Sequence, residues 1–373
     1  MNSRFILPLA FLSILSLFIL AVTNTGCEWL DDQADPETTL ESSRAAVAWA
    51  VEVGSSMRKV TPLADGSFFV CSATVYNVVT SEGELLYSSN QAMPVTIDRL
   101  SDAFGMSDGT ILLAGNYTED DYPVDGGRIF RINLDGSIIT EIDIPPRLVE
   151  YEDWYGYKYC SGFKLDELPD GSTPAILYYE SIWEVNPEYV NRVYYAEIAC
   201  EEDTLGNFIS AGGNWTAFFD CSDTGEKWAV TYYVGDGSYG YDVRIVGSDY
   251  RFHFGNNTKV FFDATSAGTL VIHNVSYSTD WVTVLDKSGT EISHFGDSEA
   301  GETAVKRGGI TAAGVPWVVI FRGGGVHFAL FDGNDRFKDE VYLGASMNIR
   351  SSCHTDDSVL LLTDGGYLYR ITL

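Results

Sequence analysis

The most regular feature of the chain is a glycine turn followed by a short run of apolar residues. In MSDGTILLAG, the turn Asp108-Gly109-Thr110 precedes the apolar run Ile111–Ala114. Glycine adopts the positive φ angles that tight hairpin turns require, and short apolar runs bounded by turns are typical of buried strands. The pattern therefore predicts β-hairpins along this stretch.

The same unit recurs along the chain. Related turns centre on positions 66, 109, 171, 225, 268, 314 and 357, which gives steps of 43, 62, 54, 43, 46 and 43 residues. Four of the six steps are nearly equal, and the two long ones contain insertions. A second turn follows in each of the first six copies, as in Asp135-Gly136-Ser137. Four strands in about 40–50 residues is the period of a β-propeller blade.

The seventh copy is one strand short, because the chain ends after YLYRITL. The strand-like run AVAWAVE, residues 46–52, precedes the first copy and has no place within it. We expect this N-terminal strand to complete the last blade, since that removes open sheet edges and lets neighbouring blades stack. The predicted fold is all-β, a seven-bladed β-propeller of four-stranded antiparallel blades, in one domain over residues 44–373.

The second copy resembles the delta-sixty type of propeller repeat. The resemblance is carried by Asp108–Gly115 and by Ile129–Ser137, in which Arg131 lies between apolar residues ahead of an Asp-Gly-Ser turn. It covers about 30 of 373 residues. It implies a propeller built of such repeats, and it carries no known catalytic residues. The Gly-His and Trp-Asp signature of WD repeats is not seen.

The first 43 residues lie outside this pattern. A positive start, Met1–Arg4, precedes an apolar run of 18 residues, Phe5–Val22, and then Gly26-Cys27. Such an order is typical of an export signal, and the Gly-Cys step resembles the bacterial lipoprotein box. Asn24 departs from the aliphatic residue usual in that box, and a plain signal peptide or an uncleaved anchor are the alternatives.

We therefore predict a lipoprotein signal peptide over residues 1–26 and an acidic tether over residues 27–43. Cys27 is expected to be acylated, for instance with palmitate, which tethers the protein to the bacterial cell envelope at the outer membrane or cell surface. The formal net charge is −30, from 53 acidic residues and 23 Lys plus Arg. A chain this acidic is repelled by nucleic acid, so that class of partner is excluded.

Five more cysteines follow the predicted lipidation site, and an odd number leaves at least one thiol unpaired. Export permits disulfides, but spacing does not give the pairing, and we interpret all five as structural. They are Cys71, Cys160, Cys200, Cys221 and Cys353. Among the five histidines there is no HxH or HExxH spacing, and no GxSxG turn or GK[ST] phosphate loop occurs. We expect no metal site, no cofactor and no assignable catalytic residue.

Charged residues recur at fixed distances before the turn positions, on the strands expected to be innermost. Seven residues before a turn stand Lys59, Asp102, Lys164, Arg307 and Arg350, and five residues before stand Asp166, Asp220 and Asp263. Positions two apart share a face of a strand, so these side chains are expected to meet near the central axis. Two interpretations are open: an internal ring of ion pairs, or a polar channel mouth that holds an anionic or sugar-like ligand.

The insertions of copies two to four are rich in aromatic residues. They are expected to emerge on one face of the ring, where large rings with a polar group make good contacts to sugars and proteins. The alternative is that these rings only cover the ends of the blades. The residues of this predicted binding face are Tyr151, Trp154, Tyr155, Tyr157, Trp183, Tyr189, Tyr239 and Tyr241.

These observations favour an envelope-anchored, monomeric recognition or scaffold module without catalysis, whose partners are envelope proteins or glycans. The competing hypothesis is an extracellular enzyme acting on polysaccharide, a glycosidase or lyase that uses the carboxylates of Asp166, Asp220 and Asp263. Glycoside cleavage needs two carboxyl groups at a defined separation, which a sequence does not supply.

Overall fold

A computed structural model describes most of the predicted domain. The described residues are 45–118, 125–151, 154–168, 174–184, 190–198, 205–210, 215–222, 225–235, 238–246, 251–254, 258–265, 268–275, 281–286, 290–295, 304–311, 313–331 and 337–373. The chain divides into two units, Met1–Ser43 and Arg44–Leu373. The predicted signal peptide, Cys27 and the acidic tether therefore lie outside the described residues.

The described residues form 29 strands and no helix, arranged as antiparallel sheets of neighbouring segments. In chain order the sheets are β2–β5 (Lys59–Pro62, Phe68–Cys71, Val75–Val79, Gln91–Ala92), β6–β9 (Arg99–Gly105, Ile111–Tyr117, Gly126–Ile132, Ile138–Ile144), β10–β14 (Arg147–Tyr151, Trp154–Glu167, Pro174–Glu184, Val190–Ile198, Leu205–Ser210), β15–β18 (Trp215–Cys221, Lys227–Gly235, Ser238–Ile245, Arg251–Phe254), β19–β22 (Thr258–Thr265, Gly268–Val275, Trp281–Leu285, Glu291–Phe295), β23–β26 (Ala304–Ile310, Pro316–Arg322, Gly325–Phe331, Phe337–Gly344) and β27–β29 (Ile349–His354, Ser358–Thr363, Tyr367–Thr372) with β1 (Ala46–Glu52).

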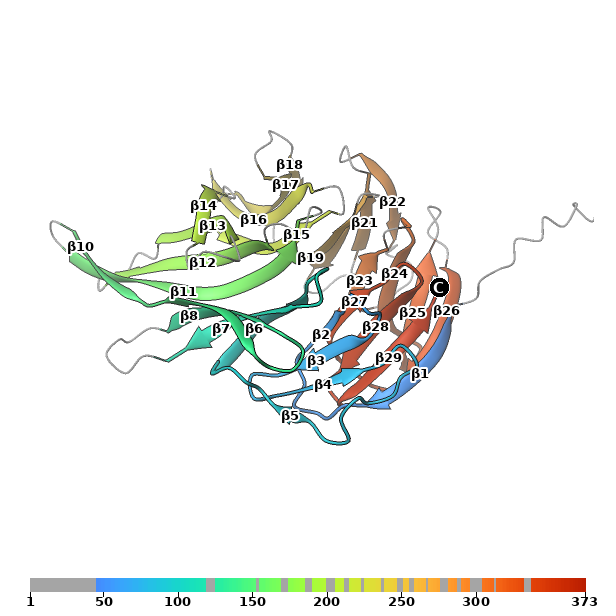
Figure 1. The fold of residues 1–373 in the computed structure, drawn as a ribbon. Coiled ribbons are helices and arrows are strands. Elements are labelled where there is room, and N and C mark those ends of the chain that lie inside the picture. Colours follow the sequence, from blue (N-terminus) through green and yellow to red (C-terminus); the bar gives the residue numbers. More distant parts are fainter. Residues whose placement is uncertain are drawn as a thin grey trace, which may run out of the picture. The chain divides into compact units, whose positions relative to one another are not determined.

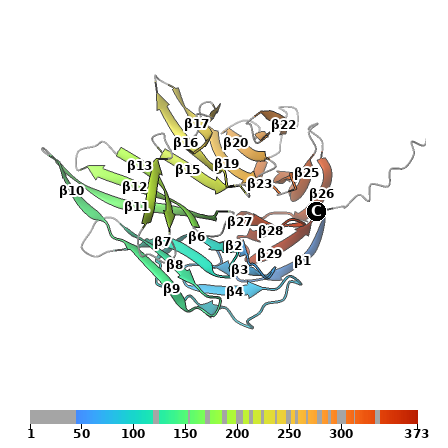
Figure 2. The ribbon, with the colours of Figure 1, turned by 45° about the horizontal axis from the view of Figure 1, so that its top comes forward.

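The first long strand of each sheet contacts its counterparts in the two neighbouring sheets. Each strand contacts the next in the order β2, β6, β11, β15, β19, β23 and β27, and β27 in turn contacts β2. Figures 1 and 2 show these innermost strands beside one another, with the later strands of each sheet farther out. The sheets therefore close into a ring around an axis lined by these strands, as the sequence pattern predicts.

The prediction of seven four-stranded blades is wrong. Within the described residues the ring has six four-stranded blades, and the sheet β10–β14 departs from the pattern with five strands. Its extra strand β10 pairs with the first part of β11, from Arg147 opposite Lys158 to Tyr151 opposite Trp154. The cause is the long insertion ahead of position 171. Its residues pair with one another as a hairpin, because backbone groups find partners most readily in an adjoining strand.

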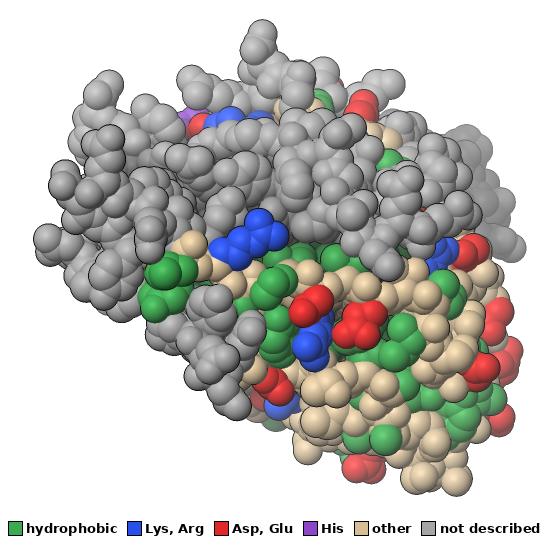
Figure 3. All heavy atoms as spheres, turned by 60° about the vertical axis from the view of Figure 1, so that its left-hand side comes forward, with side chains coloured by type: hydrophobic (Ala, Val, Ile, Leu, Met, Phe, Trp, Pro, Cys, Tyr) green, Lys and Arg blue, Asp and Glu red, His purple; other side chains and the backbone are tan. Residues whose placement is uncertain are grey.

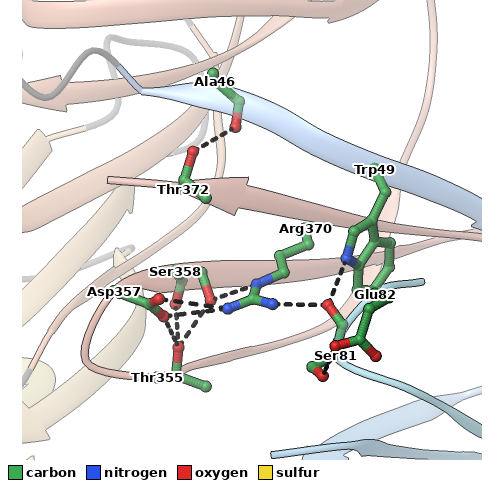
Figure 4. Close-up of polar contacts among 9 residues, drawn as sticks. All are labelled: Ala46, Trp49, Ser81, Glu82, Thr355, Asp357, Ser358, Arg370 and Thr372. Carbon is green, nitrogen blue, oxygen red and sulfur yellow. Dashed lines mark hydrogen bonds and ion pairs between the residues drawn. The ribbon is translucent and has the colours of Figure 1, made fainter.

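The expected closure of the ring is confirmed. β1 pairs antiparallel with β29, from Ala46 opposite Thr372 to Glu52 opposite Tyr367, so the N-terminal strand completes the last blade. Figure 4 shows the side-chain contacts at this junction. The hydroxyl of Thr372 donates to the carbonyl oxygen of Ala46 at 3.2 Å. The pairing covers the edge that β29 would otherwise leave open, and β1 becomes the outer strand of the sheet.

The last blade is also joined to the first. The carbonyl oxygen of Ser81, in the turn between β4 and β5, accepts hydrogen bonds from the indole of Trp49 at 3.0 Å and from the guanidinium of Arg370 at 2.8 Å. Gly83 follows in the same turn with a φ of 87°, and an added Cβ there would lie 2.7 Å from the Trp49 ring. Glycine at position 83 therefore lets the turn approach the indole closely.

Apolar residues fill the space between the blades. Three second strands whose side chains the structure describes are buried throughout, namely β3, β7 and β28. Such strands are covered on both faces, which explains their continuous apolar runs in the sequence. On the face shown in Figure 3, the charged side chains of the described residues are spread among polar and apolar ones, some with an opposite charge beside them, rather than gathered in one large patch.

The predicted turns have the expected geometry. Gly66, Gly109 and Gly136 have φ values of 83°, 86° and 86°. At Asp108, one carboxylate oxygen accepts from the backbone N–H of Thr110 at 2.9 Å and from its hydroxyl at 2.6 Å. This Asx-type turn explains why Asp, Gly and a hydroxyl residue recur together.

No described helix is long and apolar enough to cross a membrane.

Candidate functional site

The axis of the ring carries charge at two levels. Nearer the beginning of the innermost strands, the carboxylate of Asp102 on β6 is bound from both sides by Lys59 on β2 at 2.8 Å and by Lys164 on β11 at 3.2 Å. It also accepts the backbone N–H of Leu165 at 3.0 Å. Burial opposes ionisation of Asp102, but the charges of Lys164 and Lys59 outweigh it and hold its pKa below the usual range. Three blades are joined here.

Nearer the end of the innermost strands, side chains bond the next blade. In four blades, the side chain of the residue five positions before the repeated turn accepts a hydrogen bond from the next blade. The donor is the backbone N–H of the residue four positions before the repeated turn of that next blade. The donor–acceptor pairs are Gly105 to Thr61 at 2.9 Å, Cys221 to Asp166, Ala264 to Asp220 at 2.7 Å, and Ile310 to Asp263 at 2.9 Å. One repeated geometry thus explains the recurrence of short acceptor side chains at this position.

The three aspartates of this level have raised pKa values. Burial, the neighbouring charge of Asp220 and a hydrogen bond with it raise the pKa of Asp166 well above its usual value. Burial and the charge of Asp263 raise the pKa of Asp220 to about 7, and burial raises that of Asp263 to about 6. Closely spaced carboxyl groups cannot all ionise, so at neutral pH part of this group remains protonated.

A cavity of about 280 Å³ opens at this acidic level. Asp166 and Glu167 line it together with Phe104, Ser107 and His354. The imidazole of His354 lies 3.5 Å from the carboxylate of Asp263, and burial lowers its pKa. Within the described part of the chain, no group of three His, Cys, Asp or Glu residues has the arrangement of a metal site.

A larger cavity, of about 580 Å³, lies where the innermost strands begin. We call it the basic pocket. It is formed by the beginnings of β2, β6 and β27 and by the turn between β3 and β4, which puts it at the opposite end of these strands from the acidic cavity. Its lining residues are Ser56, Arg58, Lys59, Ser72, Ala73, Thr74, Asp98, Arg99, Leu100 and Arg350.

The predicted axial residues thus fall into separate groups. Lys59 and Arg350 line the basic pocket, whereas Lys59 also joins Asp102 and Lys164 in the ion-pair cluster. Arg307 on β23 donates from its Nε to the hydroxyl of Ser352 on β27 at 3.0 Å, so it also joins two blades. Among the predicted axial residues, the structure brings Lys59, Asp102 and Lys164 together in ion pairs.

Two of the four cations that line the basic pocket were not predicted from the sequence. Arg58 lies one position before Lys59, and Arg99 begins β6 three positions before Asp102. Both precede the positions that were compared between repeats. Extending that comparison toward the beginning of each innermost strand would have drawn attention to them.

The predicted aromatic face lies largely in strands. Trp154, Tyr155 and Tyr157 belong to β11, where Tyr157 is paired with Trp183 of β12. Tyr151 ends β10, and Tyr239 and Tyr241 belong to β17. Tyr189 lies outside the described residues. Of these side chains, the structure describes only Tyr157, which is half-buried.

The thiols of the described cysteines are not joined in disulfides. Cys71 and Cys160 are buried within blades, Cys221 is buried at the end of β15, and Cys353 is half-buried on β27. Burial raises the pKa of Cys353 to about 12 and that of Cys71 further still. Thiols in such surroundings are poor nucleophiles. Cys200 lies outside the described residues.

No family model and no curated protein matches the chain. Solved structures do match. Virginiamycin B lyase from Staphylococcus aureus shares 13% identity at a TM-score of 0.53, covering 88% of this chain and 99% of the other. The β-propeller domain of Cps50 (Swd1) from Myceliophteria thermophila shares 10% at 0.55, with 88% and 99% coverage. The WD40 β-propeller domain of Doa1 shares 11% at 0.52, with 88% and 97% coverage.

The chain has the β-propeller fold. At these identities the similarity concerns the fold alone, and the same fold carries unrelated functions. The function must therefore be argued from the residues of this chain.

Proposed function

We propose that this β-propeller is a non-catalytic recognition or scaffold module, held at the bacterial cell envelope by a lipid on Cys27. The observation that carries the proposal is how the axial carboxylates are engaged. Asp166, Asp220 and Asp263 each accept a backbone N–H of the next blade. Side chains used in this way hold the ring together and are fixed in place by it.

This engagement counts against the competing polysaccharide-acting enzyme. A general acid needs a raised pKa, and Asp220 has one at about 7. A general base or nucleophile, however, must keep a lone pair free toward the substrate. Here one oxygen of Asp220 and one oxygen of Asp263 are each held by a backbone N–H of the next blade, and Asp166 interacts with Asp220, which reduces their freedom to act on a substrate. The partial protonation follows from crowding of carboxyl groups and requires no catalytic purpose.

The proposed partners are envelope proteins or glycans. The ring is rigid because its ends are paired and its blades are cross-linked along the axis. A rigid ring presents loops and strand ends in a fixed arrangement, which lowers the entropic cost of binding. Repeated blades give a wide surface on each face without requiring a deep active site.

Two measurements test the proposal. The first is release of reducing ends from a panel of neutral and acidic polysaccharides by the wild-type protein and by Asp220→Asn. We expect no turnover by either protein. Turnover by the wild type that is lost in Asp220→Asn would instead establish the enzyme.

The second measurement concerns the anchor. The full chain expressed in a bacterium is expected to sediment with membranes and to incorporate labelled palmitate, whereas Cys27→Ser is expected to do neither. Equal incorporation by both proteins would refute lipidation at this position. Substituting Trp154 and Tyr155 together with alanine additionally tests whether the β10–β11 hairpin contributes to retention of a partner.

A further inference from the structure

We propose that the basic pocket is a binding site for an acidic glycan, a sugar chain that bears carboxylate, sulfate or phosphate groups. This inference rests on the recognition function proposed above and names the ligand class. It is carried by the cavity between the first, second and last blades and by the cations that converge on it.

The first argument is the charge of the lining. Arg58, Lys59, Arg99 and Arg350 line the cavity, against the single carboxylate of Asp98. That carboxylate accepts the backbone N–H of Thr118 at 2.7 Å. The whole chain carries a net charge of −30 and has only 23 Lys and Arg residues. Four cations around one cavity are therefore many more than the average composition of this acidic chain would place there.

The second argument is how these cations are paired. Lys59 is bound to Asp102 and Arg99 to Asp125. In the described part of the chain, by contrast, neither Arg58 nor Arg350 forms an ion pair with a carboxylate. Both donate from Nη1 to backbone carbonyls, Arg58 to Ser55 at 3.1 Å and Arg350 to Met57 at 3.0 Å.

The charges of these two guanidinium groups are consequently not neutralised at the cavity. Asp364 is hydrogen-bonded to Asn348, and its pKa is lowered mainly by Asn348 and only slightly by the charge of Arg350. Guanidinium groups are well suited to carboxylate, sulfate and phosphate because their planar donors form two parallel hydrogen bonds.

The third argument is that the site is held in position before any ligand arrives. Arg350 is the extra residue of a β-bulge in β27 and reaches the segment that leads into β2. Arg58 bonds the same segment at Ser55. The two side chains thus belong to different blades but share backbone acceptors. Pre-positioned donors reduce the entropy lost on binding.

The remaining lining favours a glycan over an acidic peptide. Ser56, Ser72 and Thr74 contribute hydroxyl groups, and Leu100 is the largest apolar residue of the cavity. Arginine clusters also bind acidic peptide motifs, but peptide segments commonly gain further contacts from an open strand edge or apolar pockets, and this cavity is formed by strand beginnings and turns. The volume of about 580 Å³ lies within the range typical of small-ligand sites.

Binding of polygalacturonate and of dextran sulfate tests the proposal, with uncharged dextran and poly-glutamate as comparison polymers. The probes cover both carboxylate and sulfate as the acidic group. The proteins are the wild type, Arg58→Gln with Arg350→Gln, and a matched control, Lys338→Gln, which removes one exposed cation on β26. We expect the wild type and the control to bind one or both acidic glycans, and dextran at least tenfold more weakly.

The double variant is expected to lose at least tenfold in affinity, and binding is expected to weaken as salt is added. Arg58→Gln alone serves if the double variant does not fold, since Arg58 is exposed and its loss leaves the bond from Arg350 in place. Equal binding by the wild type and the folded variants overturns the proposal. Binding of poly-glutamate with no binding of either acidic glycan also overturns it, in favour of an acidic peptide.

These outcomes are separate from those that test the proposed function. A wild-type protein that binds neutral glycans or an envelope protein, and binds no acidic glycan, leaves the recognition function standing and removes the acidic ligand. Turnover of a glycan abolished by Asp220→Asn removes the non-catalytic function, whatever the basic pocket binds.

Discussion

Trp49 on β1 gives the sharpest test of how the ring is closed. Its indole donates to the carbonyl oxygen of Ser81 at 3.0 Å, and its ring lies 6.0 Å from that of Phe68 in a tilted arrangement. The side chain is half-buried against the core between the first and last blades. Replacing Trp49 with alanine therefore removes the hydrogen bond to Ser81 (Figure 4) and the aromatic contact with Phe68, both of which cross this junction.

The magnitude follows from these contacts. A fully buried Trp→Ala substitution costs about 3–5 kcal/mol, and partial burial brings the packing loss here to about 2 kcal/mol. The lost hydrogen bond adds about 1 kcal/mol. We therefore expect Trp49→Ala to lower the free energy of unfolding by about 3 kcal/mol. Trp49→Phe should lose only about 1 kcal/mol, since Ser81 keeps its hydrogen bond from Arg370 at 2.8 Å.

Urea unfolding followed by circular dichroism at neutral pH measures the loss without depending on the removed fluorophore. Val47→Ala is the matched control, because Val47 lies on the same strand with 38% of its surface exposed. We expect that control to change the unfolding free energy by less than about 0.5 kcal/mol. A loss for Trp49→Ala no larger than that of Val47→Ala would refute the role assigned to β1.

Two further substitutions probe the contacts between neighbouring blades. Gly105→Ala places a Cβ 2.1 Å from the carbonyl oxygen of Pro62, so it should cost about 2–3 kcal/mol in urea unfolding. Gly109→Ala, with open space around its Cβ but a φ of 86°, should cost only about 1 kcal/mol. Asp102→Asn leaves Lys59 and Lys164 without their carboxylate and should lower the unfolding free energy by about 2 kcal/mol at pH 7. An unchanged midpoint for Asp102→Asn would show that this ion-pair cluster is not used for stability.

Much of the fold could be predicted from the sequence because local physics repeats along it. The turn geometry at Gly66 and Gly109 follows from the conformational freedom of glycine, and the acceptor role of Asp108 follows from its short side chain. The pairing of Ala46–Glu52 with the last blade followed from counting strands, since an incomplete blade leaves an edge exposed.

The five-stranded sheet was not predictable in the same way. The insertion before β11 reads as an aromatic loop, and nothing in its spacing fixes whether residues 147–151 pair with residues 154–158. The pairing is a matter of register between two non-repeating segments, which the repeat period does not constrain.

At the axis, the sequence placed Asp220 and Asp263 correctly on innermost strands, but it did not reveal their hydrogen bonds to the next blade. Those depend on the offset between neighbouring blades, which is a property of the ring. Only two of the four cations of the basic pocket, Lys59 and Arg350, were predicted from the sequence. Arg58 and Arg99 join Arg350 there because three separate blades lie next to one another at this point, which is again a property of the ring.

The central claim is that the axial aspartates clamp adjacent blades and share protons while doing so. Its consequence is a particular pH dependence. The folded-state pKa of Asp220 is about 7, above its ordinary value of 3.8. Between these values the folded chain keeps a proton that the unfolded chain has lost, so stability must fall as the pH rises. The fall is about 1.4 kcal/mol per pH unit for each such proton.

The half-buried His354 acts in the opposite direction, because its lowered pKa makes the folded chain bind fewer protons than the unfolded chain below pH 6.5. Comparison with Asp220→Asn isolates the aspartate from this contribution.

The most direct measurement is the unfolding free energy of the wild type and of Asp220→Asn at pH 5.0 and pH 7.5, by urea titration. Asparagine keeps an oxygen that can accept the backbone N–H of Ala264, but it has no proton to lose. The account predicts that the difference in stability between wild type and variant shifts toward the variant by about 2 kcal/mol from pH 5.0 to pH 7.5. A difference that stays constant between the two pH values would contradict the shared-proton clamp.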